Sequence, residues 1–395
     1  MTDATGRGAR GRLGHVILCL LVVACLVDIA FRFVSIDPIT FRAWEALRRY
    51  HPLGAAFEPN RRYSNERSYG DLAAMGNLRE LRQYRAEVFT TDALGFRNAA
   101  HVLDTEVGAI LAGDSFAVGS GVNDDETLSS RLSERGGCVV YNVGSEVPGI
   151  GPDQIPAIAG RLNMRGRLVI RLYAEDADEP TIPPSWQIMF RKLVALAPAE
   201  LRIWAGRLRG VVAVSPLQIL SERALKALAD DRILPNSYAS QIVRATLYNG
   251  DSILFLAKHV NDFYSRRDIP LDYWRWLRDE LQKARLDVLV LLVPGKYTVY
   301  RPFLVDQRPV GPGEGNYLDR LERELRAAGV PVLNLTPFFS AEAARLLERG
   351  EYLYWSDDIH WNARGVALAA TAIRERWPLA EVLCRNPRPL VVQKP

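Results

Sequence analysis

The amino-acid sequence predicts an α/β fold in three layers, with a parallel sheet of about five strands between two layers of helices. Short, almost continuously apolar runs recur along the chain, and helical patterns separate them. Strands that are apolar on both faces are typical of a parallel sheet that helices cover on both sides. The chain has 395 residues, 48% of them hydrophobic, which is enough to bury one large core.

Five runs are the expected strands: Val107–Ala112, Cys138–Val143, Leu168–Tyr173, Leu286–Val293 and Val330–Leu335. The expected helices lie after or between these runs: Thr127–Arg135, Asp153–Leu162, Tyr273–Ala284, Tyr317–Ala328 and Ala363–Trp377. This alternation predicts a doubly wound, flavodoxin-like sheet.

The N-terminal segment 13–34 is apolar and about as long as a helix that crosses a bilayer. Three arginines precede it, which favours a cytoplasmic N-terminus and an extracytoplasmic remainder. No small-residue cleavage site follows directly, so we expect a single-pass anchor in the cytoplasmic membrane, with the other residues in the periplasm. A cleaved signal, a buried helix and a lipoprotein processed before Cys25 remain alternatives.

Four parts are expected along the chain: an anchor (1–35), an irregular lead-in (36–100), the main α/β domain (101–380) and a tail (381–395). A helical insertion, residues 177–271, separates the third strand from the fourth. Its basic residues lie among Leu, Ala, Val and Trp. The favoured interpretation is a cap that packs on the core with its arginines in water, and the alternative is a membrane-surface helix.

Charge and cysteine content exclude some classes of function. The formal charge is +4, and without the basic N-terminus the chain is close to neutral, so nucleic acid is not an expected partner. No cysteine pair has metal-ligand spacing, which argues against a zinc site. Neither a metal nor a cofactor is expected. Cys138 and Cys384 are either a disulfide or two buried thiols.

The candidate chemistry begins at Ser115, which follows the first strand at the sheet edge where such folds bind ligands. A serine nucleophile needs a base, and His360 is the histidine expected beside the sheet, in a loop before the last helix. Asp357, three residues earlier, is expected to accept the imidazole Nδ1 proton. The alternative is that Ser115 or Asp357 only caps a helix.

These motifs resemble blocks of the SGNH/GDSL hydrolase family. Gly113–Phe116 and Asp357–Asn362 are similar to its first and last blocks, and Asn142–Gly144 with Gly149–Gln154 to its second. Asp92–Asn98 resembles a segment found upstream in this group. Pro294–Tyr300 resembles a segment of the AlgJ/AlgX-like branch, proteins of alginate O-acetylation.

The resemblance implies an oxyanion hole made by the backbone amides of Ser115 and Gly149. The family's third block supplies an asparagine to that hole, but this chain has Glu175 or Asp176 there. A carboxylate would repel the oxyanion unless it is protonated or turned away. Four residues after the fourth strand either contact the substrate or pack in the fold: Lys296, Tyr297, Tyr300 and Arg301.

Three functions follow as hypotheses. The preferred one is a serine esterase or O-acyltransferase that adds or removes acetyl esters on an exported polysaccharide. The missing asparagine motivates a second, a catalytically weak glycan-binding or scaffold component, and the third is a membrane-associated lipid esterase. Expected partners are an acylated carbohydrate or other ester, the membrane through residues 13–34, and a membrane-bound acyl-donor protein.

Overall fold

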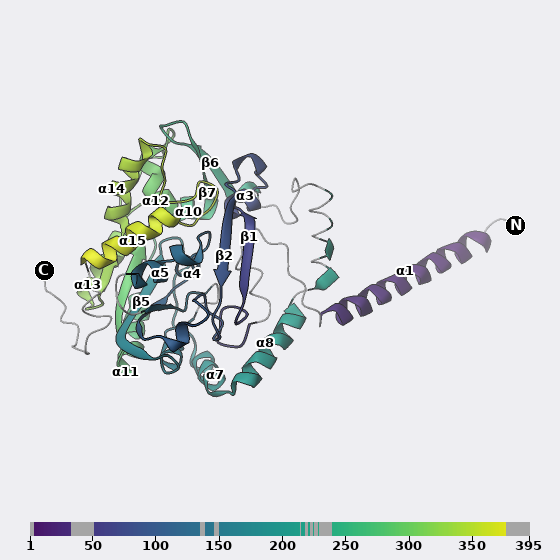
Figure 1. Cartoon of the computed structure of the whole chain (residues 1–395). Coiled ribbons are helices and arrows are strands. Elements are labelled where there is room, and N and C mark those ends of the chain that lie inside the picture. The colour runs from purple at the N-terminus through teal and green to yellow at the C-terminus, as the bar shows by residue number, and fades with distance from the viewer. Residues whose placement is uncertain are drawn as a thin grey trace.

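A computed structural model describes residues 4–32, 51–134, 139–145, 150–213 and 239–376, with residues 215–217, 220–221, 224 and 228 between the last two ranges. Figure 1 shows a body of helices around a sheet, from which one long helix projects.

The body is built on a parallel sheet of five strands, as predicted. The strands are β3 (Val107–Ala112), β4 (Val139–Asn142), β5 (Met164–Ala174), β8 (Asp287–Val293) and β9 (Val332–Asn334). Their order is β4-β3-β5-β8-β9, and every neighbouring pair is parallel. Because β3 comes first in the chain and lies inside the sheet, the chain winds outward from it in both directions, which is the doubly wound arrangement.

Helices cover both faces of the sheet and make the other two layers. One face carries α5 (Leu128–Ser133), α12 (Lys296–Tyr300), α14 (Thr336–Leu347) and α15 (Ala363–Arg376). The other face carries α6 (Ile155–Ala159), α11 (Leu271–Lys283) and α13 (Tyr317–Ala327). Each face of the sheet has its own hydrophobic core. In β5, Ile170 and Leu172 point into the core under α5 and α15, and Val169 and Tyr173 point into the core under α11 and α13. This alternation is the two-residue repeat of a strand.

The lead-in, expected to be irregular, contains regular structure. Strands β1 (Arg62–Ser68) and β2 (Arg85–Thr90) form an antiparallel hairpin, and α3 (Asp71–Met75) lies between them in the chain. Most side chains of β1 are exposed or half-buried, so the strand has no apolar face to reveal it. Figure 1 shows this hairpin upright beside the sheet.

The insertion after β5 is only partly helical. It contains α7 (Ser185–Leu196), α8 (Ala199–Ala213), a hairpin of β6 (Ile242–Thr246) and β7 (Ser252–Leu256), and α10 (Ala257–Phe263). The favoured interpretation, a cap whose apolar face packs on the core, is wrong for α7, because no residue of that helix is buried. The hairpin and the segment that follows it reach the core, through residues that include Ile253, Phe255 and Tyr264.

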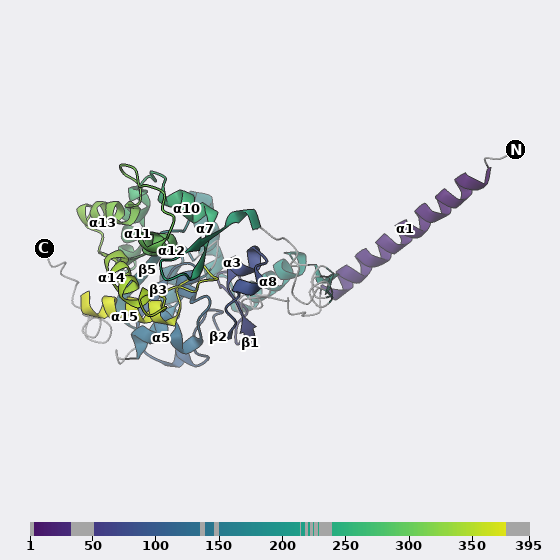
Figure 2. The ribbon, with the colours of Figure 1, turned by 90° about the horizontal axis from the view of Figure 1, so that it is seen from above.

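The N-terminal helix α1 (Ala4–Phe31) projects away from the body in both views (Figures 1 and 2). Its stretch Arg12–Phe31 is long and apolar enough to cross a membrane, and none of it is buried. These properties are those of a signal sequence or of a single membrane anchor. Cys19 and Cys25 in this helix are free and exposed. The open question of a pairing between Cys138 and Cys384 lies outside the described residues.

Candidate active site

The turn after β3 presents the candidate nucleophile. Asp114 caps the four-residue helix α4 (Ser115–Val118), and its Oδ1 accepts a hydrogen bond from the Phe116 amide at 3.0 Å. The helix ends at Gly119, whose φ of 83° lies in the left-handed region that glycine adopts without a steric cost. Ser115 is half-buried at the carboxyl edge of the sheet, where the sequence placed it.

Ser115 and His360 meet although 245 residues separate them. The His360 Nε2 atom lies 2.7 Å from the Ser115 Oγ. The other ring nitrogen, Nδ1, lies 2.6 Å from Oδ1 of Asp358. His360 and Asp358 are buried, and the hydroxyl, imidazole and carboxylate form a continuous chain of hydrogen bonds. This arrangement is the one in which imidazole accepts a serine proton while a carboxylate orients the ring.

The prediction that Asp357 orients the imidazole is wrong, since Asp358 occupies that position. Asp358 Oδ1 also accepts the backbone N–H of His360 at 3.1 Å, a local turn that brings the carboxylate to the ring two residues on. Asp357 points the opposite way. Its Oδ2 accepts the backbone N–H groups of Gly70 and Gln83, both at 2.8 Å.

Arg85 of β2 joins both aspartates. Its Nη2 lies 2.9 Å from Asp358 Oδ2 and its Nη1 lies 3.2 Å from Asp357 Oδ1. Burial by itself would raise the pKa of the Asp358 carboxyl, but His360 and Arg85 outweigh burial and hold that pKa below its ordinary value. For Asp357 the balance is opposite, because burial raises its pKa and the adjacent Asp358 adds to the effect. Asp358 is therefore the carboxylate that stays ionised beside the imidazole.

The lead-in forms a cradle for the loop that carries His360, a role that sequence reasoning missed. The backbone of Gly70 lies so close to this loop that a Cβ there would be 2.0 Å from the Asp357 carbonyl oxygen. Asp71 Oδ1 accepts the Ile359 amide at 3.0 Å, and Gln83 Oε1 accepts the Ser356 amide at 3.0 Å. More than 270 residues separate the partners in these bonds, so no local sequence pattern predicts these contacts.

A different motif of the lead-in braces the nucleophile turn. Arg97 donates to the carbonyl oxygens of Gly119 at 2.6 Å and Val122 at 2.7 Å, directly beyond α4. Asn98 Nδ2 donates to the Asn142 carbonyl of β4 at 3.0 Å. The segment Asp92–Asn98, which resembles a segment found upstream in the SGNH/GDSL group, thus holds the end of α4 and β4 in place.

The residues after β8 pack in the fold. Lys296 is buried and its Nζ donates to the carbonyl oxygens of Leu254, Ser356 and Asp358, at 2.8, 2.9 and 3.0 Å. Burial lowers its pKa to about 7. Tyr297 and Tyr300 are also buried, and Arg301 donates to the Tyr264 hydroxyl. For these four residues, substrate contact and packing were both open. Their contacts favour packing, and those of Lys296 also support the loop that carries His360.

The two carboxylates in place of the family's asparagine turn toward the loop after β8. Glu175 Oε2 accepts the Gly295 amide at 2.8 Å, and burial, with the neighbouring Asp176, raises its pKa to about 7. Asp176 Oδ2 lies 3.3 Å from Nδ1 of His259. Gly149, the other residue assigned to an oxyanion hole, lies outside the described residues.

One group in the described part of the chain has the spacing of a metal site: Asp71, Asp358 and His360, whose ligand atoms lie within 4.8 Å of one another. Asp358 and His360 are bonded to each other, and the Arg85 guanidinium occupies the remaining oxygen of Asp358. A cation there would face that positive charge, so the residues fit proton transfer better than metal binding.

Comparison with known proteins identifies the C-terminal part. Residues 270–392 match a family model described as "SGNH hydrolase-like domain, acetyltransferase AlgX", which confirms the resemblance noted in the motifs. The matched segment contains Asp358 and His360 but not Ser115. No curated protein sequence matches the chain. One solved chain, described only as a crystal structure, is 13% identical and covers 71% of this chain and 98% of its own, but its TM-score of 0.31 carries no argument.

Proposed function

Because residues 270–392 carry the SGNH hydrolase-like domain of the AlgX acetyltransferase family, we propose that this chain is a serine O-acetyltransferase or esterase. Its substrate would be an exported polysaccharide that gains or loses acetyl groups. The observation that supports this proposal is the hydrogen-bonded series from Ser115 Oγ through His360 to Asp358. Three such groups in a row can activate an otherwise weak alcohol nucleophile.

The proposed reaction has two halves. Ser115 Oγ attacks the carbonyl carbon of an acetyl ester while His360 Nε2 takes the hydroxyl proton, and Asp358 stabilises the imidazolium. The donor oxygen then leaves with the proton from His360, and an acetyl-serine remains. In the second half, His360 removes the proton of an acceptor hydroxyl, which attacks the acetyl group and regenerates Ser115. A sugar hydroxyl as acceptor gives transfer, and water gives hydrolysis.

Stabilisation of the oxyanion is proposed to come from the backbone amides of Ser115 and Gly149. The bond from Gly295 to Glu175 supports this assignment, because it turns the carboxylate toward another loop. Loss of one oxyanion donor typically lowers turnover about 10²- to 10³-fold, so the missing asparagine sets a limit on rate. That substitution is also the observation that favours the second candidate, a catalytically weak glycan-binding component.

We further propose that α1 anchors the chain in the cytoplasmic membrane, with the body on the extracytoplasmic side. The exposed apolar span and the arginines before it support this orientation. A membrane-bound partner would then be able to deliver acetyl groups to Ser115.

The test is an acetyl-transfer assay on the full chain in lipid nanodiscs, with p-nitrophenyl acetate as donor and neutral or acidic oligosaccharides as acceptors. Mass spectrometry should show acetyl groups gained by an acceptor, or nitrophenol release alone if the chain is an esterase. Ser115→Ala should lower turnover at least about 10³-fold, the scale seen when a triad nucleophile is lost. Labelling by a fluorophosphonate should occur at Ser115 in the unmodified chain.

A Ser130→Ala variant serves as control, because Ser130 is a half-buried serine on α5 and takes no part in the triad. Equal turnover in Ser115→Ala and Ser130→Ala would exclude Ser115 as nucleophile. A folded chain that neither turns over nor labels would leave the glycan-binding component as the better proposal.

A further inference from the structure

Two consecutive helices of the insertion expose apolar stripes that no described residue of the chain covers. On α7 the exposed large side chains include Trp186, Met189, Phe190, Leu193 and Leu196, and on α8 they include Leu201, Trp204, Leu208 and Val212. They recur every three or four residues, so each set lies along one side of its helix. Trp186 is 67% exposed and Leu196 is 83% exposed, so the described part of the chain leaves most of both side chains uncovered. Contiguous exposed apolar patches usually mark an interaction surface.

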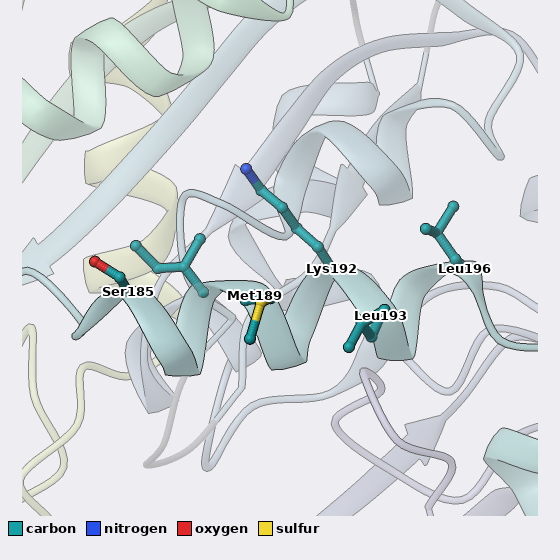
Figure 3. A pocket seen from close by; sticks show the side chains of 6 residues that line it. Ser185, Met189, Lys192, Leu193 and Leu196 are labelled. Carbon is teal, nitrogen blue, oxygen red and sulfur yellow. The ribbon is translucent and has the colours of Figure 1, made fainter.

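A hollow on α7 has the same character (Figure 3). The residues that line it are Ser185, Ile188, Met189, Lys192, Leu193 and Leu196. All six belong to this one helix, so its open side faces away from the rest of the described chain. In this view the Lys192 side chain extends away from that of Met189, with its ammonium group farthest from the helix.

The opposite sides of both helices are fastened to the body. On α7, Arg191 Nη1 lies 3.1 Å from Oδ1 of Asp153. On α8, Gly206 and Gly210 are buried, and the Arg202 carbonyl accepts the Leu53 amide at 3.2 Å. The apolar stripes are therefore presented by helices that the fold holds in place.

The end of α8 meets the end of the candidate membrane span. Arg32 Nη1 donates to the carbonyl oxygens of Val211 and Val212, both at 2.9 Å. Asp28 Oδ1 accepts the Ser215 hydroxyl at 2.7 Å. Figure 1 shows α8 leading from α7 to the base of α1. If α1 crosses a bilayer, α8 ends where the span leaves it.

Charge selects the kind of surface that these helices fit. Residues 185–213 contain five Lys or Arg and one Glu, a net charge of +4, as large as that of the entire chain. Interfacial helices combine Trp, Phe and Leu on one side with Lys and Arg around it, and they favour anionic lipids.

We propose that α7 and α8 form a docking surface for the anionic lipid bilayer that α1 enters. This inference rests on the proposed membrane anchor and adds a second membrane contact to it. Arg191 links α7 to Asp153, which lies four positions after Gly149 in the sequence. Docking would thus hold the edge of the active site at a defined height above the lipid, where a membrane-bound acetyl donor can reach it.

The test measures contact with lipid at single positions of the full chain. All four native cysteines are replaced by serine, and one new cysteine carries an environment-sensitive fluorophore. Met189→Cys and Leu208→Cys report on the proposed surface, Leu21→Cys reports on the span, and Arg349→Cys is a control beyond α14. The proteins are reconstituted in phosphatidylcholine–phosphatidylglycerol vesicles that contain nitroxide-labelled lipid.

Quenching at positions 189 and 208 should be several times that at 349, and it should fall when phosphatidylglycerol is omitted, while quenching at 21 stays high. Quenching at 21 together with the control level at 189 and 208 overturns the docking surface and leaves the anchor intact. No quenching at 21 overturns the anchor, and the docking surface with it. Self-quenching between labels at 189 without lipid quenching would show a second copy on this surface and also overturns the proposal.

Discussion

Asp357 and Asp358 are identical neighbouring side chains that take different roles. Both carboxylates are buried, and both contact Arg85. Only Asp358 reaches the imidazole, while Asp357 accepts two backbone amides of the lead-in. The first contact belongs to the proposed proton-transfer series, and the second fastens one loop to another.

This division predicts different effects for two isosteric substitutions. Asp358→Asn should lower acetyl-ester turnover about 10³- to 10⁴-fold with KM little changed, because an amide cannot stabilise the imidazolium and favours the wrong tautomer. Asp357→Asn, the matched control, keeps an oxygen for Gly70 and Gln83 and should lower turnover less than about tenfold. Steady-state kinetics on both variants is the measurement. The reverse order of effects would return Asp357 to the role first predicted for it.

Among the elements, the β1–β2 hairpin and α3 belong to the candidate active site. Gly70 and Asp71 at α3, with Gln83 and Arg85 at β2, all bond to the loop that carries Asp358 and His360. Lys296 supports the same loop from the other side through two of its carbonyl oxygens, those of Ser356 and Asp358. A loop held from two sides keeps its histidine in a defined position, and small displacements of catalytic groups cost much activity.

The close approach of Gly70 makes the cradle testable. In Gly70→Ala the new Cβ would meet the Asp357 backbone oxygen at 2.0 Å, so the loop or the hairpin has to move. We expect a loss of stability of about 1–3 kcal/mol and a fall in turnover of about 10²-fold. Thermal unfolding and acetyl-ester kinetics measure the two effects.

Gly160→Ala is the matched control, since its Cβ would have no neighbour closer than 3.6 Å. Its stability and turnover should stay near those of the unmodified chain. If the two variants behave alike, the hairpin does not position the His360 loop.

For the whole molecule, buried groups with shifted pKa values make stability depend on pH. The pKa of Glu175 is about 7 in the folded state against an ordinary value of 4.5. The folded state therefore favours the protonated form, so this contribution is fully present below pH 4.5 and is lost as pH rises through 7. At about 1.4 kcal/mol for each pKa unit, the loss approaches about 3 kcal/mol.

Glu175→Gln removes this titration and keeps an oxygen for the Gly295 amide. The stability of the unmodified chain should fall relative to that of Glu175→Gln between pH 4.5 and 7, as thermal unfolding at several pH values would show. Lys296, whose pKa is also about 7, is present in both proteins, so its effect cancels in the difference. Asp178→Asn, at a carboxylate 85% exposed, is the control. Parallel pH profiles for all three proteins would contradict the assignment to Glu175.

Local patterns along the chain were enough to predict part of the molecule. Apolar runs and helical spacing predicted all five strands of the sheet, and residue type and position along the chain selected Ser115 and His360. Three other features became known from the folded chain alone: Asp358, not Asp357, faces His360, the lead-in holds this loop, and α7 exposes its apolar side. The two groups differ in the sequence separation of the residues that interact. Strand and helix patterns arise between residues a few positions apart, whereas the cradle joins residues more than 270 positions apart, and burial of a helix face depends on what the rest of the fold places against it.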